Sequence, residues 1–116
     1  MSTTALDIFN GAARAAIQQT VRSHDATCAR FHAALADAER TYKDAKRAAE
    51  VAYRAEGNHR GHILRAGMHA ADAAHETALA TIRATLHAGL RANDSAFDAA
   101  MTAADAALGA ATQENP

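Results

Sequence analysis

The C-terminal half of the chain carries an eleven-residue apolar repeat. From Leu64 to Leu108, apolar residues recur in steps of four, three and four, and the cycle never slips. Eleven residues in three turns is about 3.67 residues per turn, close to a straight α-helix. The repeat therefore predicts one long helix with a continuous stripe, made of Leu64, Met68, Ala71, His75, Leu79, Ile82, Leu86, Leu90, Asn93, Phe97, Met101, Ala104 and Leu108.

The N-terminal half predicts a second helix of similar length. Thr4 and Asp7 resemble a capping box, and the apolar stripe that follows has mostly coiled-coil-like spacing. The strongest helix breaker in the chain, Gly-Asn-His-Arg-Gly, occupies 57–61. The predicted stripe comprises Leu6, Phe9, Ala13, Ile17, Val21, His24, Cys28, Phe31, Leu35, Ala38, Tyr42, Ala45, Ala49 and Ala52.

These signals predict an all-α fold, a long antiparallel helical hairpin in a single domain spanning 1–116. Its helices are expected at about 4–56 and 62–112, joined by a turn at 57–61. Polar residues at 23–25 and 93–95 leave open a second arrangement, in which both arms break and fold back into a four-helix bundle. The repeat continues through 93, which favours the long hairpin.

Alanine supplies 35 of the 116 residues, the chain has no Trp, and the one Pro is residue 116. Alanine favours helix but buries little apolar area, so a hairpin of this composition has a thin core. We therefore expect a homo-oligomer, most simply a dimer, that associates through Ala-rich helix faces. We call the line of contact between the two helices the seam. Its larger predicted residues are Phe9, Phe31, Leu35, Tyr42, Leu64, Met68, Leu79, Ile82, Leu86, Leu90, Phe97 and Met101.

The formal net charge of −1 does not favour nucleic acid as a partner. Charge is unevenly distributed, because 40–65 is rich in Lys and Arg whereas 92–116 has four acidic residues and no basic one. Head-to-tail stacking or ordinary solvated helix faces both account for this pattern. We find no membrane-spanning segment or secretory signal, which predicts a protein that is cytoplasmic or exported without a classical signal peptide.

Histidine and cysteine form a possible metal site. His24, Cys28 and His32 follow helical i, i+4, i+8 spacing, and the hairpin places His87 at the same level. Imidazole and thiolate ligands suit zinc or copper. The alternative is that His24 and Cys28 are ordinary seam residues, with the other two bordering the seam.

Basic residues gather around the predicted turn: Arg54, His59, Arg60, His62 and Arg65. With the amides at the start of the second helix, they could bind an anionic partner. The alternative is an exposed turn with the polar residues that turns usually carry.

We find no catalytic motif, so we expect a non-enzymatic structural or assembly protein that acts through helix–helix contacts. A zinc- or copper-binding bundle and an adaptor with a basic tip are the alternatives. Within the seam, we expect Tyr42 to hydrogen-bond His75, and Asn93 to specify register or oligomeric state.

The plan of two long helices and a short turn in about a hundred residues resembles the small helical hairpins exported by type VII secretion. The Trp-x-Gly turn of that family is missing here, and its C-terminal Tyr/Phe-x-x-x-Asp/Glu signal is not met, because Met101 stands four residues after Phe97. The resemblance implies architecture only, and it assigns no residue a role.

Overall fold

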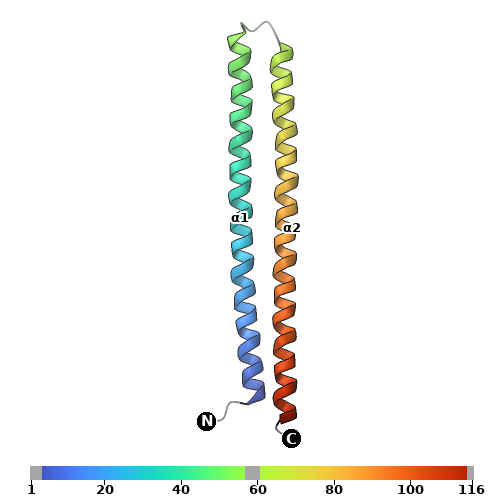
Figure 1. Cartoon of the computed structure of the whole chain (residues 1–116). Helices are drawn as coiled ribbons and strands as arrows, with labels where there is room; N and C mark the ends of the chain where they lie inside the picture. Colours follow the sequence, from blue (N-terminus) through green and yellow to red (C-terminus); the bar gives the residue numbers. More distant parts are fainter. Residues whose placement is uncertain (1–3, 57–60, 115–116) are drawn as a thin grey trace. The chain divides into compact units, whose positions relative to one another are not determined.

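The computed structural model describes residues 4–56 and 61–114, and these residues form two α-helices (Figure 1). Helix α1 spans Ala5–Ala55 and helix α2 spans Gly61–Glu114. The predicted all-α helical hairpin is therefore confirmed. Residues 23–25 and 93–95 are helical, so neither helix has the break that a four-helix bundle requires. The predicted turn falls mostly on 57–60, outside the described residues.

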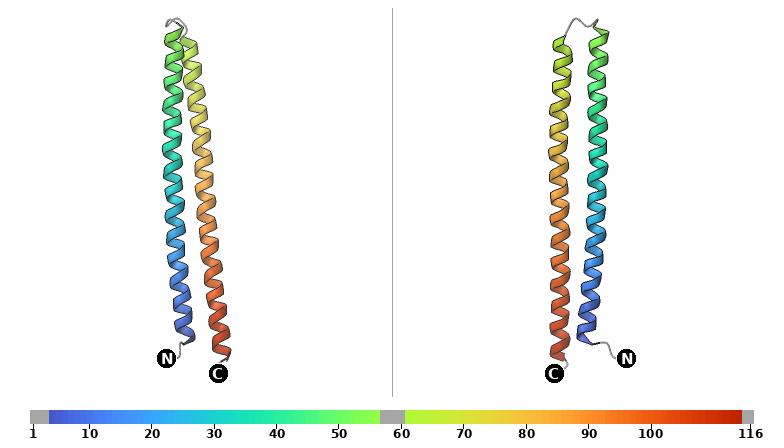
Figure 2. Two further views of the ribbon diagram at one scale, coloured as in Figure 1. Left: turned by 60° about the vertical axis from the view of Figure 1, so that its left-hand side comes forward. Right: turned by 180° about the vertical axis from the view of Figure 1, so that it is seen from behind.

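The chain divides into two units. Unit 1 combines Met1–Cys28 with His87–Pro116, and unit 2 is Ala29–Leu86. Within each unit, α1 and α2 lie side by side and antiparallel in every view (Figures 1 and 2).

The predicted capping box at the start of α1 is confirmed. The Thr4 hydroxyl oxygen accepts a hydrogen bond from the Asp7 amide at 3.1 Å, and the Asp7 carboxylate accepts one from the Thr4 amide at 3.3 Å. These bonds satisfy amides that have no partner within the helix.

The predicted stripe of α2 is the surface that packs against α1 in each unit, because all thirteen of its residues are buried or half-buried. The buried apolar residues among those described are only alanines: Ala16, Ala71 and Ala104. Thr27 is the buried polar residue, and the large seam side chains such as Phe31 and Leu86 are half-buried. The seam thus encloses little apolar area per residue.

The predicted stripe of α1 is wrong between 16 and 27. Ala16, Thr20, Ser23 and Thr27 face the partner helix there, whereas the expected Ile17 and Val21 are more than half exposed and His24 is exposed. From 20 onward the half-buried positions of α1 follow an eleven-residue repeat of their own. Heptad-like spacing does not match a helix that has 3.67 residues per turn. The predicted stripe was therefore displaced by one residue in this stretch.

At two glycines the helices lie too close together for a side chain on α2. A Cβ atom added to Gly67 would lie 2.7 Å from the Ala49 Cβ, and one added to Gly89 would lie 2.9 Å from the Thr27 Cγ2. The first pair lies in unit 2 and the second in unit 1, and the two residue numbers of each pair sum to 116. Both glycines are required because the opposing helix leaves no room for a methyl group.

We expect Gly67→Ala to lower the free energy of unfolding by about 1 kcal/mol, because the overpacking outweighs the gain in helix propensity. Gly109→Ala is the matched control, since a Cβ there meets nothing within 4 Å. That variant gains about 0.5–1 kcal/mol. Urea unfolding at one fixed protein concentration measures both changes. Adding Ala49→Gly should restore stability to the Gly67→Ala variant, and equal stabilisation by both Gly→Ala changes would contradict the close approach.

Candidate functional site

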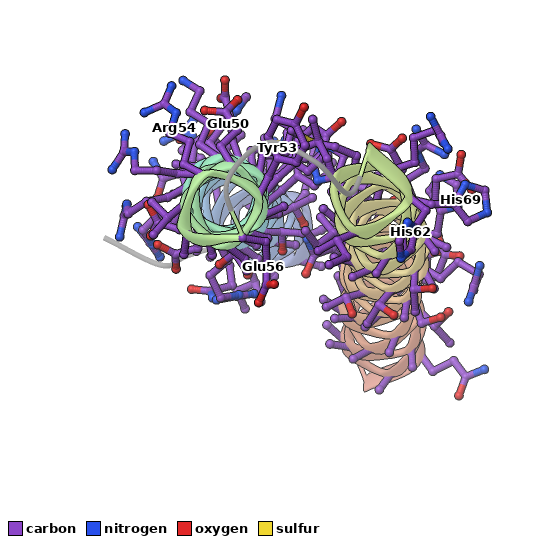
Figure 3. The ribbon with its side chains drawn as sticks, turned by 90° about the horizontal axis from the view of Figure 1, so that it is seen from above. Glu50, Tyr53, Arg54, Glu56, His62 and His69 are labelled. Carbon is purple, nitrogen blue, oxygen red and sulfur yellow. The ribbon has the colours of Figure 1, made fainter. Side chains whose placement is uncertain are left out.

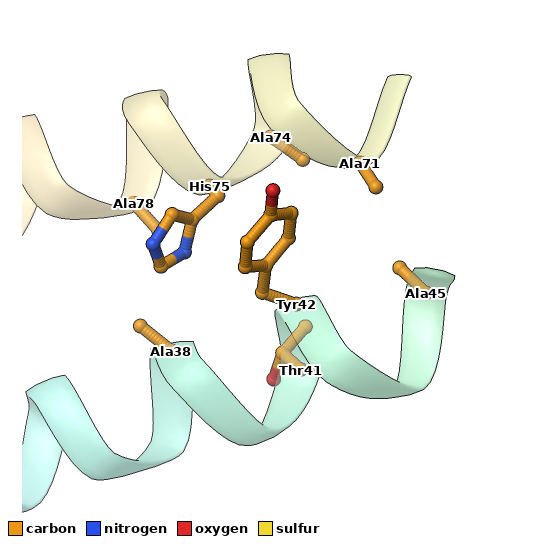
Figure 4. A pocket seen from close by; sticks show the side chains of 8 residues that line it. All are labelled: Ala38, Thr41, Tyr42, Ala45, Ala71, Ala74, His75 and Ala78. Atoms are coloured by element: carbon orange, nitrogen blue, oxygen red, sulfur yellow. The ribbon is translucent and has the colours of Figure 1, made fainter. Parts of the chain in front are cut away.

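A small pocket in unit 2 lies between the helices around Tyr42 and His75 (Figure 4). Tyr42 projects from α1 and His75 from α2, and their rings lie side by side in the middle of the pocket. The pocket has a volume of about 120 Å³. Its remaining walls are small side chains, namely Ala38, Thr41, Ala45, Ala71, Ala74 and Ala78.

The Tyr42 and His75 rings stack instead of forming the expected hydrogen bond. Their centroids are 4.3 Å apart with 11° between the planes. The Tyr42 hydroxyl donates to the Asp72 carboxylate at 2.5 Å, and the Lys46 ammonium lies 4.3 Å from the centroid of the Tyr42 ring. The His75 Nδ1 atom is buried without a hydrogen-bond partner. One tyrosine thus contacts two residues of α2, through a hydrogen bond to Asp72 and a ring stack on His75, and fixes the register of the helix pair in unit 2.

The hydrogen bond to Asp72 raises the pKa of Tyr42 above its ordinary value, and partial burial and the negative charge of Asp72 act in the same direction. A phenolate could not donate this bond and would repel the carboxylate.

A second pocket, of about 50 Å³, lies in unit 1. Each α1 residue that lines it comes 22 positions before an α1 residue that lines the unit 2 pocket. Each α2 residue that lines it comes 22 positions after an α2 residue that lines the unit 2 pocket. The close pairs Thr27–Gly89 and Ala49–Gly67 differ by the same 22 positions. Both units therefore repeat one local packing pattern at a distance of two eleven-residue repeats. The unit 1 pocket is lined by Ala16, Gln19, Thr20, Ser23, Asn93, Ala96, Phe97 and Ala100.

A polar pair joins the helices of unit 1. The Asn93 side-chain amide donates to the Thr27 hydroxyl oxygen at 3.1 Å, and that hydroxyl donates to the Ser23 carbonyl at 2.9 Å. Thr27 is only 4% exposed, so the bond satisfies a buried polar group. The bond gives Asn93 a way to set register, as the sequence suggested; its predicted role in oligomeric state stays a prediction.

Two of the four predicted metal ligands meet. The Cys28 sulfur lies 3.7 Å from the His24 Nδ1 atom in unit 1. His32 is exposed on unit 2 with its ring 5.7 Å from that of Phe31, and His87 is exposed on unit 1. No group of three or more His, Cys, Asp or Glu side chains is arranged to hold a metal ion in the part of the chain that the structure describes. Zinc or copper binding here stays a prediction.

The predicted anion-binding residues lie partly outside the described ranges, since His59 and Arg60 fall within 57–60. Arg54, His62 and Arg65 are exposed. Arg54 lies beside Glu50 on the outer side of α1, whereas His62 lies on α2 (Figure 3). The anion-binding function of this end therefore also stays a prediction.

The surface of α2 has a charge-free side that the sequence reading missed. Each charged residue between 61 and 113 comes directly after a stripe residue. Successive residues are 100° apart on a helix, so these charges share one side. They are Arg65, Asp72, Glu76, Arg83, Arg91, Asp94, Asp98 and Asp105.

From Gly67 onward, a small residue stands one position before each stripe residue, and Gly67, Ala78 and Gly89 among these are half-buried. In unit 1 this small-residue face consists of five exposed alanines: Ala92, Ala96, Ala100, Ala103 and Ala107. In unit 2 the equivalent side includes Thr81 and Thr85, whose hydroxyls donate to carbonyls four residues earlier and so need no outside partner. The position of each charge relative to the stripe was the signal in the sequence that could have revealed this face.

None of the helical residues described forms a segment that is long and apolar enough to cross a membrane. No protein-family model matches the sequence, and no curated protein and no solved structure is significantly similar to it.

We expect the tyrosinate absorbance of Tyr42 to rise at a pH above the ordinary tyrosine pKa of about 10. A Tyr53→Phe background isolates this titration, and adding Asp72→Asn should lower its midpoint. The raised pKa means that the Tyr42–Asp72 bond stabilises the fold fully below about pH 10 and loses this effect as the pH rises through the pKa of the folded state. An unchanged midpoint in the Asp72→Asn variant would contradict this assignment.

Proposed function

We propose that this protein is a non-enzymatic structural or assembly protein that self-associates through Ala-rich helix faces. The observation that carries the proposal is the small-residue face of unit 1, which is exposed, uncharged and continuous along α2. Alanine side chains let a second helix backbone approach closely, as Gly67 and Ala49 already do within unit 2.

The exposed area of the chain supports the same proposal. Leu6, Ile17 and Val21 of α1 are each more than half exposed. Association can thus bury apolar area that the seam between α1 and α2 leaves exposed.

The separation of charge on α2 also supports association through one side of that helix. Charged side chains are depleted in the centres of protein interfaces because an unpaired buried charge is costly. The side of α2 that carries Asp94 and Asp98 is suited to solvent, whereas the side that carries Ala96 and Ala100 has no charge to desolvate.

We expect Ala96→Arg to raise the dissociation constant of the assembly by about tenfold or more, because the new charge would be buried without a partner. Ala80→Arg is the matched control, since Ala80 is exposed on the charged side of α2. Arginine is a good helix former, so circular dichroism should show equal helicity for both variants. Sedimentation velocity measures the assembly. A monomeric parent protein at micromolar concentration would refute self-association, and equal effects of the two variants would refute the face.

A further inference from the structure

Unit 1 carries large apolar side chains that are more than half exposed. Leu6, Ile17 and Val21 are 59%, 53% and 54% exposed. Each follows directly after a residue that faces α2, so the three project from α1 about 100° around the helix from the seam. Leu6 and Ile17 are eleven residues apart, and Val21 lies one turn beyond Ile17. We call these three residues the apolar ridge; Asn10 and His24 lie on the same side of α1 and are also exposed.

Unit 2 shows that the fold does not need this ridge. The two units repeat the same packing at 22 positions, and the unit 2 equivalents of Ile17 and Val21 are Glu39 and Lys43. Those two residues form an exposed ion pair at 3.3 Å with 64% of each side chain accessible. The same place on the same packing pattern is thus solvated in unit 2 and apolar in unit 1. A role in holding α1 against α2 therefore does not explain the ridge.

The ridge and the small-residue face of unit 1 are complementary in size, and neither surface carries a charge. The ridge presents branched apolar side chains, and the face presents exposed alanines, so ridge side chains can fit between alanine methyl groups. The face also lies beside the unit 1 pocket, since Ala96 and Ala100 belong to both. Both surfaces repeat at helical spacing that follows eleven-residue periodicity, so side chains that match at one level also match at the next.

We propose that the apolar ridge of one copy of this chain packs on the small-residue face of unit 1 in a second copy. The inference rests on the proposed self-association and names its two surfaces. A second copy is the occupant because every copy carries both an exposed apolar ridge and an exposed, uncharged small-residue face on which such a ridge fits. A contact between two different surfaces is heterologous, so each added copy brings one free ridge and one free face. Such an assembly grows into a filament or closes into a ring.

Two variants each remove one surface. Ile17→Glu with Val21→Lys removes the ridge by copying the residues of unit 2, which the same packing already accommodates. Ala96→Arg removes the face. Val51→Lys is the control for the first variant, because Val51 is 59% exposed on α1 away from the ridge. Ala80→Arg is the control for the second.

We expect each surface variant alone to sediment as a monomer, and the controls to assemble as the parent protein does. An equimolar mixture of the two surface variants should form a 1:1 heterodimer, because the intact face of one meets the intact ridge of the other. The heterodimer cannot grow, since its remaining surfaces are the altered ones. Circular dichroism checks that every variant keeps its helicity.

The possible failures are distinguishable. A monomeric parent protein overturns the proposed function and this inference together. A parent-sized assembly from the ridge variant overturns the inference alone, because the chain would self-associate without the ridge. A mixture that stays monomeric, although each variant has lost self-association, also overturns the inference alone, since it would mean that each surface meets its own copy.

Discussion

The size of the residues where α1 meets α2 is the constraint on which the rest of the structure depends. Gly67 and Gly89 bring the helices so close that a methyl group would clash, and the buried apolar residues beside them are alanines. Close backbones and small side chains make a regular seam, but they bury little apolar area. Large apolar residues are consequently left half-buried or exposed, and such residues are available for contacts outside the hairpin.

A seam made of alanine does not by itself define which residues face each other, because small side chains fit at several registers. Each unit has a specific interaction that settles this. In unit 2, Tyr42 donates to Asp72 and stacks on His75, and in unit 1 Asn93 donates to Thr27. These polar interactions add little apolar burial, so they determine alignment more than stability.

The eleven-residue repeat was sufficient to predict α2 and its stripe, because long periodic signals identify a helix face. Between 16 and 27 on α1 the coiled-coil-like spacing gave the wrong stripe, since Ile17 and Val21 are more apolar than the Ala16 and Thr20 that face α2. Tyr42 hydrogen-bonds Asp72 and not His75. The Asp72 carboxylate lies just outside the stripe and competes with His75 as an acceptor. The size of the apolar side chains was enough to identify candidates for the contact between the helices. Which of these large residues stay exposed and available to a partner can be seen only in the paired helices.

The dependence of thermal stability on protein concentration tests the central claim most directly, namely that contacts between copies supply apolar burial that the hairpin lacks. Binding that favours the folded state makes the midpoint of unfolding depend on concentration. Thermal melts followed by circular dichroism from about one to one hundred micromolar should show a midpoint that rises steadily with concentration. A midpoint that stays constant over this range would show that the hairpin is stable alone, and would contradict the account.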